Sequence, residues 1–313
     1  MAHDHEHHHH HIHMEEGSTL PIALTVLTNL GITVAELIGG YLSGSVALTA
    51  DALHNLGDSM SSLLVWIAKV IEKKGADERH TFGFKRSEVI ASFTVSIILI
   101  LSGFYILKEI IERTLSGGFE IDPRILLPVA ILGLLGNIVG IWLLWKQAKH
   151  SMSIKGAMIH LISDALSSVL VTVEGVLLFI GFKNLWYLDL IVGAFIVYFL
   201  FSHGWEILIH SIHILMEGVP PWANIDEIKE IIEGYDPRID DIHDIHVYTI
   251  SGDEAYVEVH AVVPEDMRVK EVDILRDRIK EELSNRWHKN INLTLQVEAK
   301  NCHCKEHRHN HEE

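Results

Sequence analysis

Apolar residues are concentrated in six long blocks within the first two thirds of the chain. Each block has about 20 residues or more, which is enough for a helix to cross a hydrocarbon core about 30 Å thick. Six such blocks joined by short polar connections predict an α-helical integral membrane domain. The predicted spans are Leu20–Tyr41, Val46–Val70, Val89–Ile111, Ile125–Trp145, Gly156–Phe182 and Leu185–Ile209.

The last hundred residues have the pattern of a small soluble domain. Residues 223–234 and 269–287 have the spacing of amphipathic helices, whereas residues 239–250, 255–263 and 292–298 read as strands. The resulting order, αββαβ, predicts a sheet with helices on one face. We therefore divide the chain into a His-rich tail (1–19), a transmembrane domain (20–211), a cytosolic domain (212–300) and a Cys/His-rich tail (301–313).

Composition agrees with this division and adds an orientation. The 313-residue chain is 48% hydrophobic with a mean hydropathy of +0.22, which is too apolar for an ordinary soluble protein. Its net charge of −17 lies largely in the termini and the C-terminal third, so it says little about the membrane part. Lys and Arg are concentrated in the loops after the second and fourth spans, which predicts that both termini are cytoplasmic. Because the start is acidic and His-rich, we expect no secretory signal peptide.

Ionisable residues inside two of the spans are the strongest functional signal. A charged side chain at bilayer depth costs about 2.5–3.5 kcal/mol on insertion scales, so such residues are functional candidates. His54 and Asp58 are four residues apart and share one helix face, and His160 and Asp164 repeat this spacing. The two pairs could supply the four ligands of a tetrahedral zinc ion. Asp51 fits a supporting or packing role better than a ligand role.

Other polar residues in the spans favour structural roles. Asn29 and Glu36 lie seven residues apart on one face of the first span, which favours a polar contact between helices. Asp189 and His203, near the ends of the sixth span, are expected at the membrane interfaces, with a structural role favoured over a ligand role.

Histidine and cysteine are also abundant in the two tails. The start, MAHDHEHHHHHIHMEE, holds eight of the 23 histidines, and the end, NCHCKEHRHNHEE, holds four together with Cys302 and Cys304. Such tracts bind metal ions loosely, and a purification tag is the alternative explanation of the N-terminal run. Two cysteines so close together fit a reduced cytosolic thiol pair better than a disulfide framework.

Five motifs, in order along the chain, resemble the cation diffusion facilitator family, especially its bacterial zinc exporters and the animal ZnT-type transporters. They are SGSVALTADALHNLGD, KKGADERHTFGFKRSE, SIKGAMIHLISDAL, LMEGVP and DIHDIHVYTISG. The resemblance implies a homodimer of six-helix protomers with ferredoxin-like cytosolic domains that exports Zn²⁺ in exchange for protons. It also implies a transport site of His54, Asp58, His160 and Asp164. Histidine at the first of these positions is associated with zinc, with cobalt or cadmium as lesser substrates.

The resemblance extends to a second site in the loop after the second span. Asp77 and His80 match two ligands that some family members carry there. Phe84 stands where those members have a second histidine, so we expect this loop site to be weak or absent.

A third site is implied in the cytosolic domain, where the family pattern favours His243, His260 and Glu298. His246 lies three residues from His243, so the two would point to opposite faces of a regular strand. Gln296 stands where some relatives place histidine. The alternative is that these histidines are ordinary polar strand residues. Cys302 and Cys304 could complete a site in the same or the partner protomer.

Together these observations predict a proton-coupled zinc transporter that works by alternating access in a prokaryotic cell (inner) membrane. We expect no enzymatic activity, no organic cofactor and no nucleic-acid partner. Two other readings stay open. An intramembrane metalloenzyme could use the same side chains, although four protein ligands leave no open position for water. The second alternative is a membrane-anchored metal sensor or store, although helices that serve only as an anchor need no buried charge.

Overall fold

The computed structural model describes residues 19–145, 148, 152–182, 186–236, 238–251 and 254–299. The described residues up to Val70, together with Ala91–Leu208, form one compact unit. Ile71–Ile90 and the residues from Ile209 onward form a second unit. The loop after the second helix therefore belongs to the same unit as the C-terminal domain.

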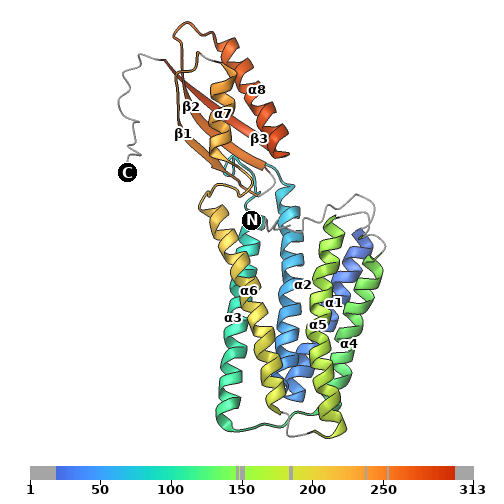
Figure 1. Cartoon of the computed structure of the whole chain (residues 1–313). Coiled ribbons are helices and arrows are strands. Elements are labelled where there is room, and N and C mark those ends of the chain that lie inside the picture. Colours follow the sequence, from blue (N-terminus) through green and yellow to red (C-terminus); the bar gives the residue numbers. More distant parts are fainter. Residues whose placement is uncertain are drawn as a thin grey trace. The chain divides into compact units, whose positions relative to one another are not determined.

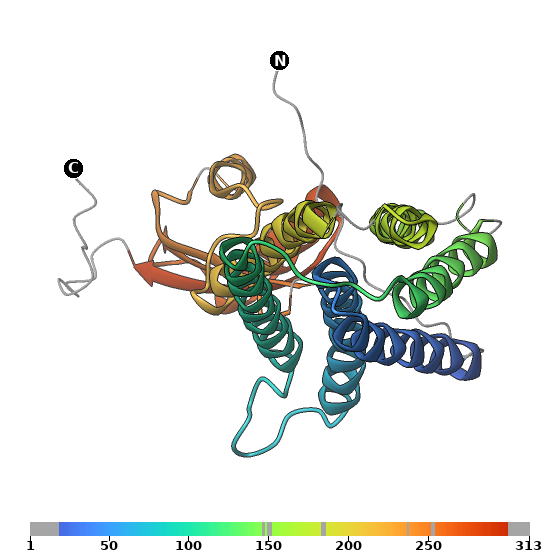
Figure 2. The ribbon, with the colours of Figure 1, turned by 90° about the horizontal axis from the view of Figure 1, so that it is seen from below.

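Six long helices form the first unit, and the ends of α2, α3 and α6 extend into the second unit (Figure 1). Figure 2 shows the helices from one end, and both views place α4 beside α5 and α1 beside α4. Within the described residues, α3, α4, residues Met158–Ile180 of α5, and α6 are long and apolar enough to cross a membrane. The helices are α1 (Thr19–Ser43), α2 (Val46–Glu72), α3 (Ser87–Ser116), α4 (Pro123–Leu144), α5 (Met152–Ile180) and α6 (Trp186–Leu215).

Small residues allow close approach between these helices. Gly133 of α4 faces Glu36 of α1, and a Cβ atom at Gly133 would overlap the Glu36 carboxylate. Glu36 is fully buried and accepts a hydrogen bond of 2.9 Å from Asn55 Nδ2 of α2. This contact joins three helices through one buried carboxylate, in line with the polar contact between helices predicted for Glu36.

The start of α2 is fixed by a side chain from α6. Asp189 accepts hydrogen bonds from Ser45 Oγ at 2.5 Å, from Val46 N at 2.8 Å and from Ala47 N at 3.2 Å. The first N–H groups of a helix have no partner within the helix, and a carboxylate at that end is favoured by the helix dipole. Asp189 is fully buried, so this cap ties α2 to α6 and sets the register of the residues that follow.

The second unit contains a three-stranded sheet in the order β1-β2-β3. β1 pairs antiparallel with β2, whereas β2 pairs parallel with β3 because α8 carries the chain between them. The element order αββαβ confirms the sequence-based prediction. The elements are α7 (Ile225–Tyr235), β1 (Asp241–Tyr248), β2 (Glu254–Val263), α8 (Val269–Trp287) and β3 (Asn290–Ala299).

Strand alternation divides this sheet into a covered face and a polar face. Along β2 the residues Ala255, Val257 and Val259 are fully buried against the apolar sides of α7 and α8. The intervening residues, which include Tyr256 and His260, are directed to the opposite face because successive side chains alternate in a strand. The two helices therefore cover one face, and the polar residues of β2 lie on the other.

Within the second unit, three contacts attach the 71–90 loop to residues that come after α6. Arg86 Nη2 lies 2.7 Å from Glu217 Oε1, Lys85 pairs with Glu254, and the ring of Phe82 meets that of Tyr256 edge-on at 6.0 Å. Partial burial disfavours the charge on Lys85, but the hydrogen bond and charge of Glu254 outweigh this and raise the Lys85 pKa.

The core of the second unit predicts how stability responds to truncation. Ile279 of α8 is fully buried, so Ile279→Ala should cost about 2–5 kcal/mol through lost burial and a residual cavity. Thermal unfolding of the full chain, followed by circular dichroism in detergent, measures the loss. Lys280→Ala, at the exposed neighbouring position, is the control and should leave the transition unchanged. Equal effects of the two variants would contradict this assignment of the core.

Candidate functional site

The four side chains predicted to bind metal in the helical unit converge between α2 and α5. His54 Nε2 of α2 lies 3.3 Å from Asp164 Oδ1 of α5, and His160 Nε2 of α5 lies 3.2 Å from Asp58 Oδ2 of α2. Each histidine thus faces a carboxylate of the other helix. The pairs within one helix are slightly longer, at 3.7 Å for His54 to Asp58 and 3.6 Å for His160 to Asp164.

This group is compact and only partly open to solvent. Ligand atoms of His54, Asp58 and Asp164 all lie within 4.8 Å of one another. The exposed fraction is 6% for the Asp164 side chain, 13% for His54 and 37% for His160. Buried carboxylates need a positive partner, which either a divalent cation or protonated imidazoles can provide here. The nitrogen and oxygen donors suit zinc and similar ions.

A hydrogen-bonded brace lies directly beside the group. Asp51 of α2 accepts hydrogen bonds from Ser167 Oγ at 2.6 Å and from Ser168 Oγ at 3.0 Å, both on α5. Ser168 in turn accepts from Asn137 Nδ2 of α4 at 3.2 Å. Asp51 and Ser168 are almost fully buried. The brace therefore holds α2, α5 and α4 together one turn from His54 and Asp164, and it gives the contacts behind the supporting role inferred for Asp51.

Sequence reasoning placed His203 in a structural role, yet it lies at the edge of the group. Its ring faces that of His160, with centroids 6.2 Å apart and planes inclined by 30°. No spacing rule connects His203 of α6 with a pair on α5, so only the packing of the helices reveals the contact.

The polar face of the C-terminal sheet brings the second predicted set together. His243 and His260 are directly opposite one another on β1 and β2, and their ring centroids are 5.5 Å apart. Glu298 of β3 reaches both, with Oε1 at 3.2 Å from His260 Nδ1 and Oε2 at 3.7 Å from His243 Nε2. Gln296 of β3 is the cross-strand partner of His260, on the edge of β2 opposite to β1. These residues share one face because cross-strand partners and alternate residues do so.

A β-bulge adds a residue that the sequence pattern did not predict. The register shifts between His243 and His246, and Asp244 adopts a left-handed backbone conformation with φ of 48°. One extra residue in a strand interrupts the alternation of faces, and aspartate tolerates positive φ better than most residues. Ligand atoms of Asp244, His243 and His260 consequently lie within 4.8 Å of one another.

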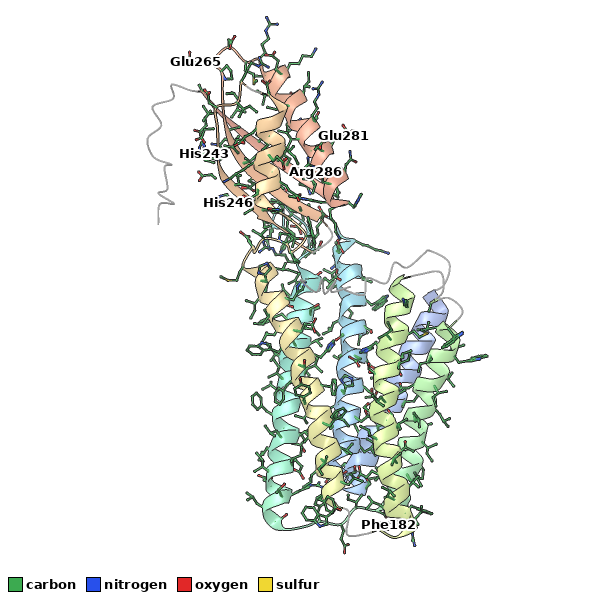
Figure 3. All side chains as sticks on the ribbon, in the orientation of Figure 1. Phe182, His243, His246, Glu265, Glu281 and Arg286 are labelled. Atoms are coloured by element: carbon green, nitrogen blue, oxygen red, sulfur yellow. The ribbon has the colours of Figure 1, made fainter. Side chains whose placement is uncertain are left out.

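The bulge also changes the expectation for His246. In a regular strand His246 would point away from His243, but here it pairs with Glu258, which is on the same face as His260. Both histidines lie along β1 (Figure 3), and His246 is exposed. Beyond it, Tyr248 donates a hydrogen bond of 3.0 Å to Glu258, and burial together with this bond raises the Tyr248 pKa to about 12.

The loop pair has a local structural explanation. Asp77 Oδ1 accepts hydrogen bonds from the backbone N–H groups of Arg79 at 2.8 Å and His80 at 2.6 Å, which lower the Asp77 pKa. His80 Nδ1 lies 3.0 Å from the same oxygen, and its ring packs on Phe84 with centroids 4.4 Å apart. The loop thus holds two candidate ligands with an aromatic ring beside them. Cys302, Cys304 and the N-terminal histidine run lie outside the described residues.

Comparison with known proteins identifies the family. Residues 22–216 match the cation efflux transmembrane domain, and residues 220–300 match the cation efflux protein cytoplasmic domain. The chain belongs to the cation diffusion facilitator family of metal cation efflux transporters. The family resemblance inferred from the five motifs is therefore confirmed, and a transporter is supported over an enzyme. Because it belongs to this family, the chain is a membrane protein. The family includes bacterial relatives.

Several relatives of this cation diffusion facilitator cover most of its length. It is 32% identical over 278 residues to a cadmium, cobalt and zinc/H⁺-K⁺ antiporter of Bacillus subtilis, a match that covers 87% of this chain and 86% of that protein. It is 31% identical over 303 residues to the zinc transporter ZitB of Pectobacterium atrosepticum, covering 95% and 92% respectively. A solved structure of the putative zinc transporter CzrB in its zinc form has 26% identity, covers 27% of this chain and 92% of that one, and has a TM-score of 0.22.

The brace beside the helical group makes a prediction. Asp51→Ala keeps all four candidate ligands but removes the acceptor that holds α5, so we expect zinc affinity to fall about 10–100-fold, the usual effect of losing an outer-shell partner. Asp51→Asn retains one accepting oxygen and should lose less. Calorimetric titration of zinc into the solubilised chain measures both. An affinity unchanged in Asp51→Ala would show that the brace does not position the ligands.

Proposed function

We propose that this chain exports divalent cations, with Zn²⁺ as its main substrate, by proton-coupled alternating access around His54, Asp58, His160 and Asp164. The observation that carries the proposal is the convergence of two imidazoles and two carboxylates, one pair from each of α2 and α5, with inter-helix distances of 3.2 and 3.3 Å. A charged group within a membrane-spanning helix is costly, so its presence there marks a functional site. The names of the relatives, which include zinc, cadmium and cobalt carriers, support the same substrate class.

Proton coupling follows from the chemistry of the ligands. Zinc binds neutral imidazole and ionised carboxylate, so metal binding expels protons and protonation expels metal. Histidine exchanges protons near physiological pH. An inwardly directed proton gradient can therefore release the ion on the outer side and reset the empty group, which makes the exchange of Zn²⁺ for H⁺ productive.

The arrangement of helices supports alternating access. The two pairs come from different helices, so a relative tilt of α2 and α5 changes which end of the group is open. We place all six helices in the cell membrane, with both termini and the 71–90 loop on the cytoplasmic side, because Lys and Arg are concentrated there.

The C-terminal unit is proposed to be a ferredoxin-like domain that dimerises and senses metal. His243, His260 and Glu298, joined by Asp244 through the bulge, form its binding group. Zinc bound on this face draws the two domains of a homodimer together, so that export rises when cytosolic zinc is plentiful. Asp77 and His80 offer only two ligands and are not assigned a transport role.

Transport by reconstituted protein tests the main proposal. We expect zinc uptake into proteoliposomes with an acidic lumen to exceed uptake without a pH gradient, because protons leaving the lumen exchange for zinc. Asp58→Ala and Asp164→Ala should reduce this uptake to background, since each removes a ligand. Glu112→Ala, on an exposed part of α3, is the control. Uptake that ignored the gradient, or that survived in both aspartate variants, would refute the proposal.

Distance measurements test the role of the cytosolic group. Spin labels at Glu281→Cys, exposed on α8 (Figure 3), in a chain lacking the two native cysteines, should approach their counterparts in the partner when zinc is added. His260→Ala should abolish the change, whereas His246→Ala, on the same face but outside the group, should preserve it. A distance that is insensitive to zinc in the unmodified sheet would rule out this sensing role.

A further inference from the structure

A fifth ionisable side chain borders the group between α2 and α5. His203 comes from α6, and its ring faces His160 with centroids 6.2 Å apart. His203 also interacts electrostatically with Asp58. The edge of the group is thus lined by an imidazole from a third helix, although the two H-x-x-x-D pairs already account for four ligands.

The packing of α6 fixes this position. Leu200 is fully buried in a cluster with Val95 and Leu99 of α3. A Cβ at Gly204 would lie 3.1–3.2 Å from side-chain atoms of Ile100 and Leu99, so α6 and α3 are in close contact at this glycine. His203, between these positions in sequence, sits on the flank of the α3 contact, and its ring reaches α5 instead.

His203 lies at one particular end of the group. Asp58 follows His54 by four residues, or about 6 Å along α2, and His160 faces Asp58. His203 therefore lies beside His160 and Asp58, the pair that is nearer along α2 to the 71–90 loop. His160 is also the most exposed of the four ligands, at 37%. An ion arriving from the loop side meets these side chains before it meets His54 and Asp164.

We propose that His203 is an additional metal-binding residue, which binds the incoming divalent cation together with His160 and Asp58 before the ion passes to the four-ligand group. Zinc requires nitrogen ligands at about 2.0–2.1 Å, and rings 6.2 Å apart can both reach one ion after a side-chain rotation. Three protein ligands leave one position for water, so the ion keeps part of its hydration at this stage. His54 and Asp164 then replace His203 and the water.

This entry step rests on the proposed transport function, and it differs from a purely structural stacking role. His203→Phe keeps a ring against His160 but cannot bind metal, whereas His203→Cys loses the ring and keeps a zinc ligand. We expect His203→Phe to raise the KM for zinc about tenfold, at the low end of the usual effect of supporting residues, with kcat unchanged. His203→Cys should stay close to the wild-type KM. His210→Ala, which removes another histidine of α6, is the matched control.

Zinc binding in a second background separates this inference from the proposed function. His54→Ala should stop transport but leave weak zinc binding at His160, Asp58 and His203, and adding His203→Phe should remove that binding. A wild-type KM in His203→Phe, or residual zinc binding between α2 and α5 that His203→Phe does not change, would overturn the entry role. Normal zinc transport by His54→Ala would refute the proposed function. The KM of His203→Phe would then still show whether His203 contributes to zinc binding.

Discussion

Two carboxylates held between apolar helices require compensating positive charge, and the contact between α2 and α5 depends on that requirement. Each carboxylate lies closer to the imidazole of the opposite helix, at 3.2 and 3.3 Å, than to the imidazole of its own helix, at 3.7 and 3.6 Å, so the shorter ion pairs link the two helices. An ion pair in a medium of low dielectric is weak evidence for stability, because desolvation opposes the attraction. The proposed function gives these pairs another role, because a divalent cation would take the place of the protons in each transport cycle.

Such a group needs supports that stay in place while its charge changes. The Asp51 carboxylate is bonded to two serine hydroxyls of α5, and the Asp189 carboxylate caps the first turn of α2 from α6. Both acceptors lie outside the ligand set, so a change in ligand charge does not remove their partners. These hydrogen bonds therefore hold the backbone next to the four candidate ligands, and they link it to α4 and α6.

Much of this structure could be predicted from local sequence patterns. Apolar blocks predicted the six long helices, although within the part of the chain that the structure describes four of them qualify as spans by length and composition. The i, i+4 spacing predicted that His54 and Asp58 share a face. Long-range packing carries no such signal. The alternation of faces predicted opposite directions for His243 and His246, but a bulge at Asp244 interrupts it. The contact of His203 with His160 and the assignment of Ile71–Ile90 to the second unit likewise depend on how distant segments pack.

The choice of histidine at positions 54 and 160 has a further consequence for the proposed transport cycle, in which the group returns empty after each export step. Four carboxylates would leave an empty group with four negative charges or require four protons, and either state is costly in an apolar medium. Two imidazoles opposite two carboxylates can instead form two neutral ion pairs when the imidazoles are protonated, and four metal–ligand bonds when the imidazoles are neutral. The empty and loaded groups then differ little in net charge. In the proposed cycle, the side chains whose donor atoms suit zinc and similar ions would therefore also lower the cost of the return step, which would link metal binding to proton exchange.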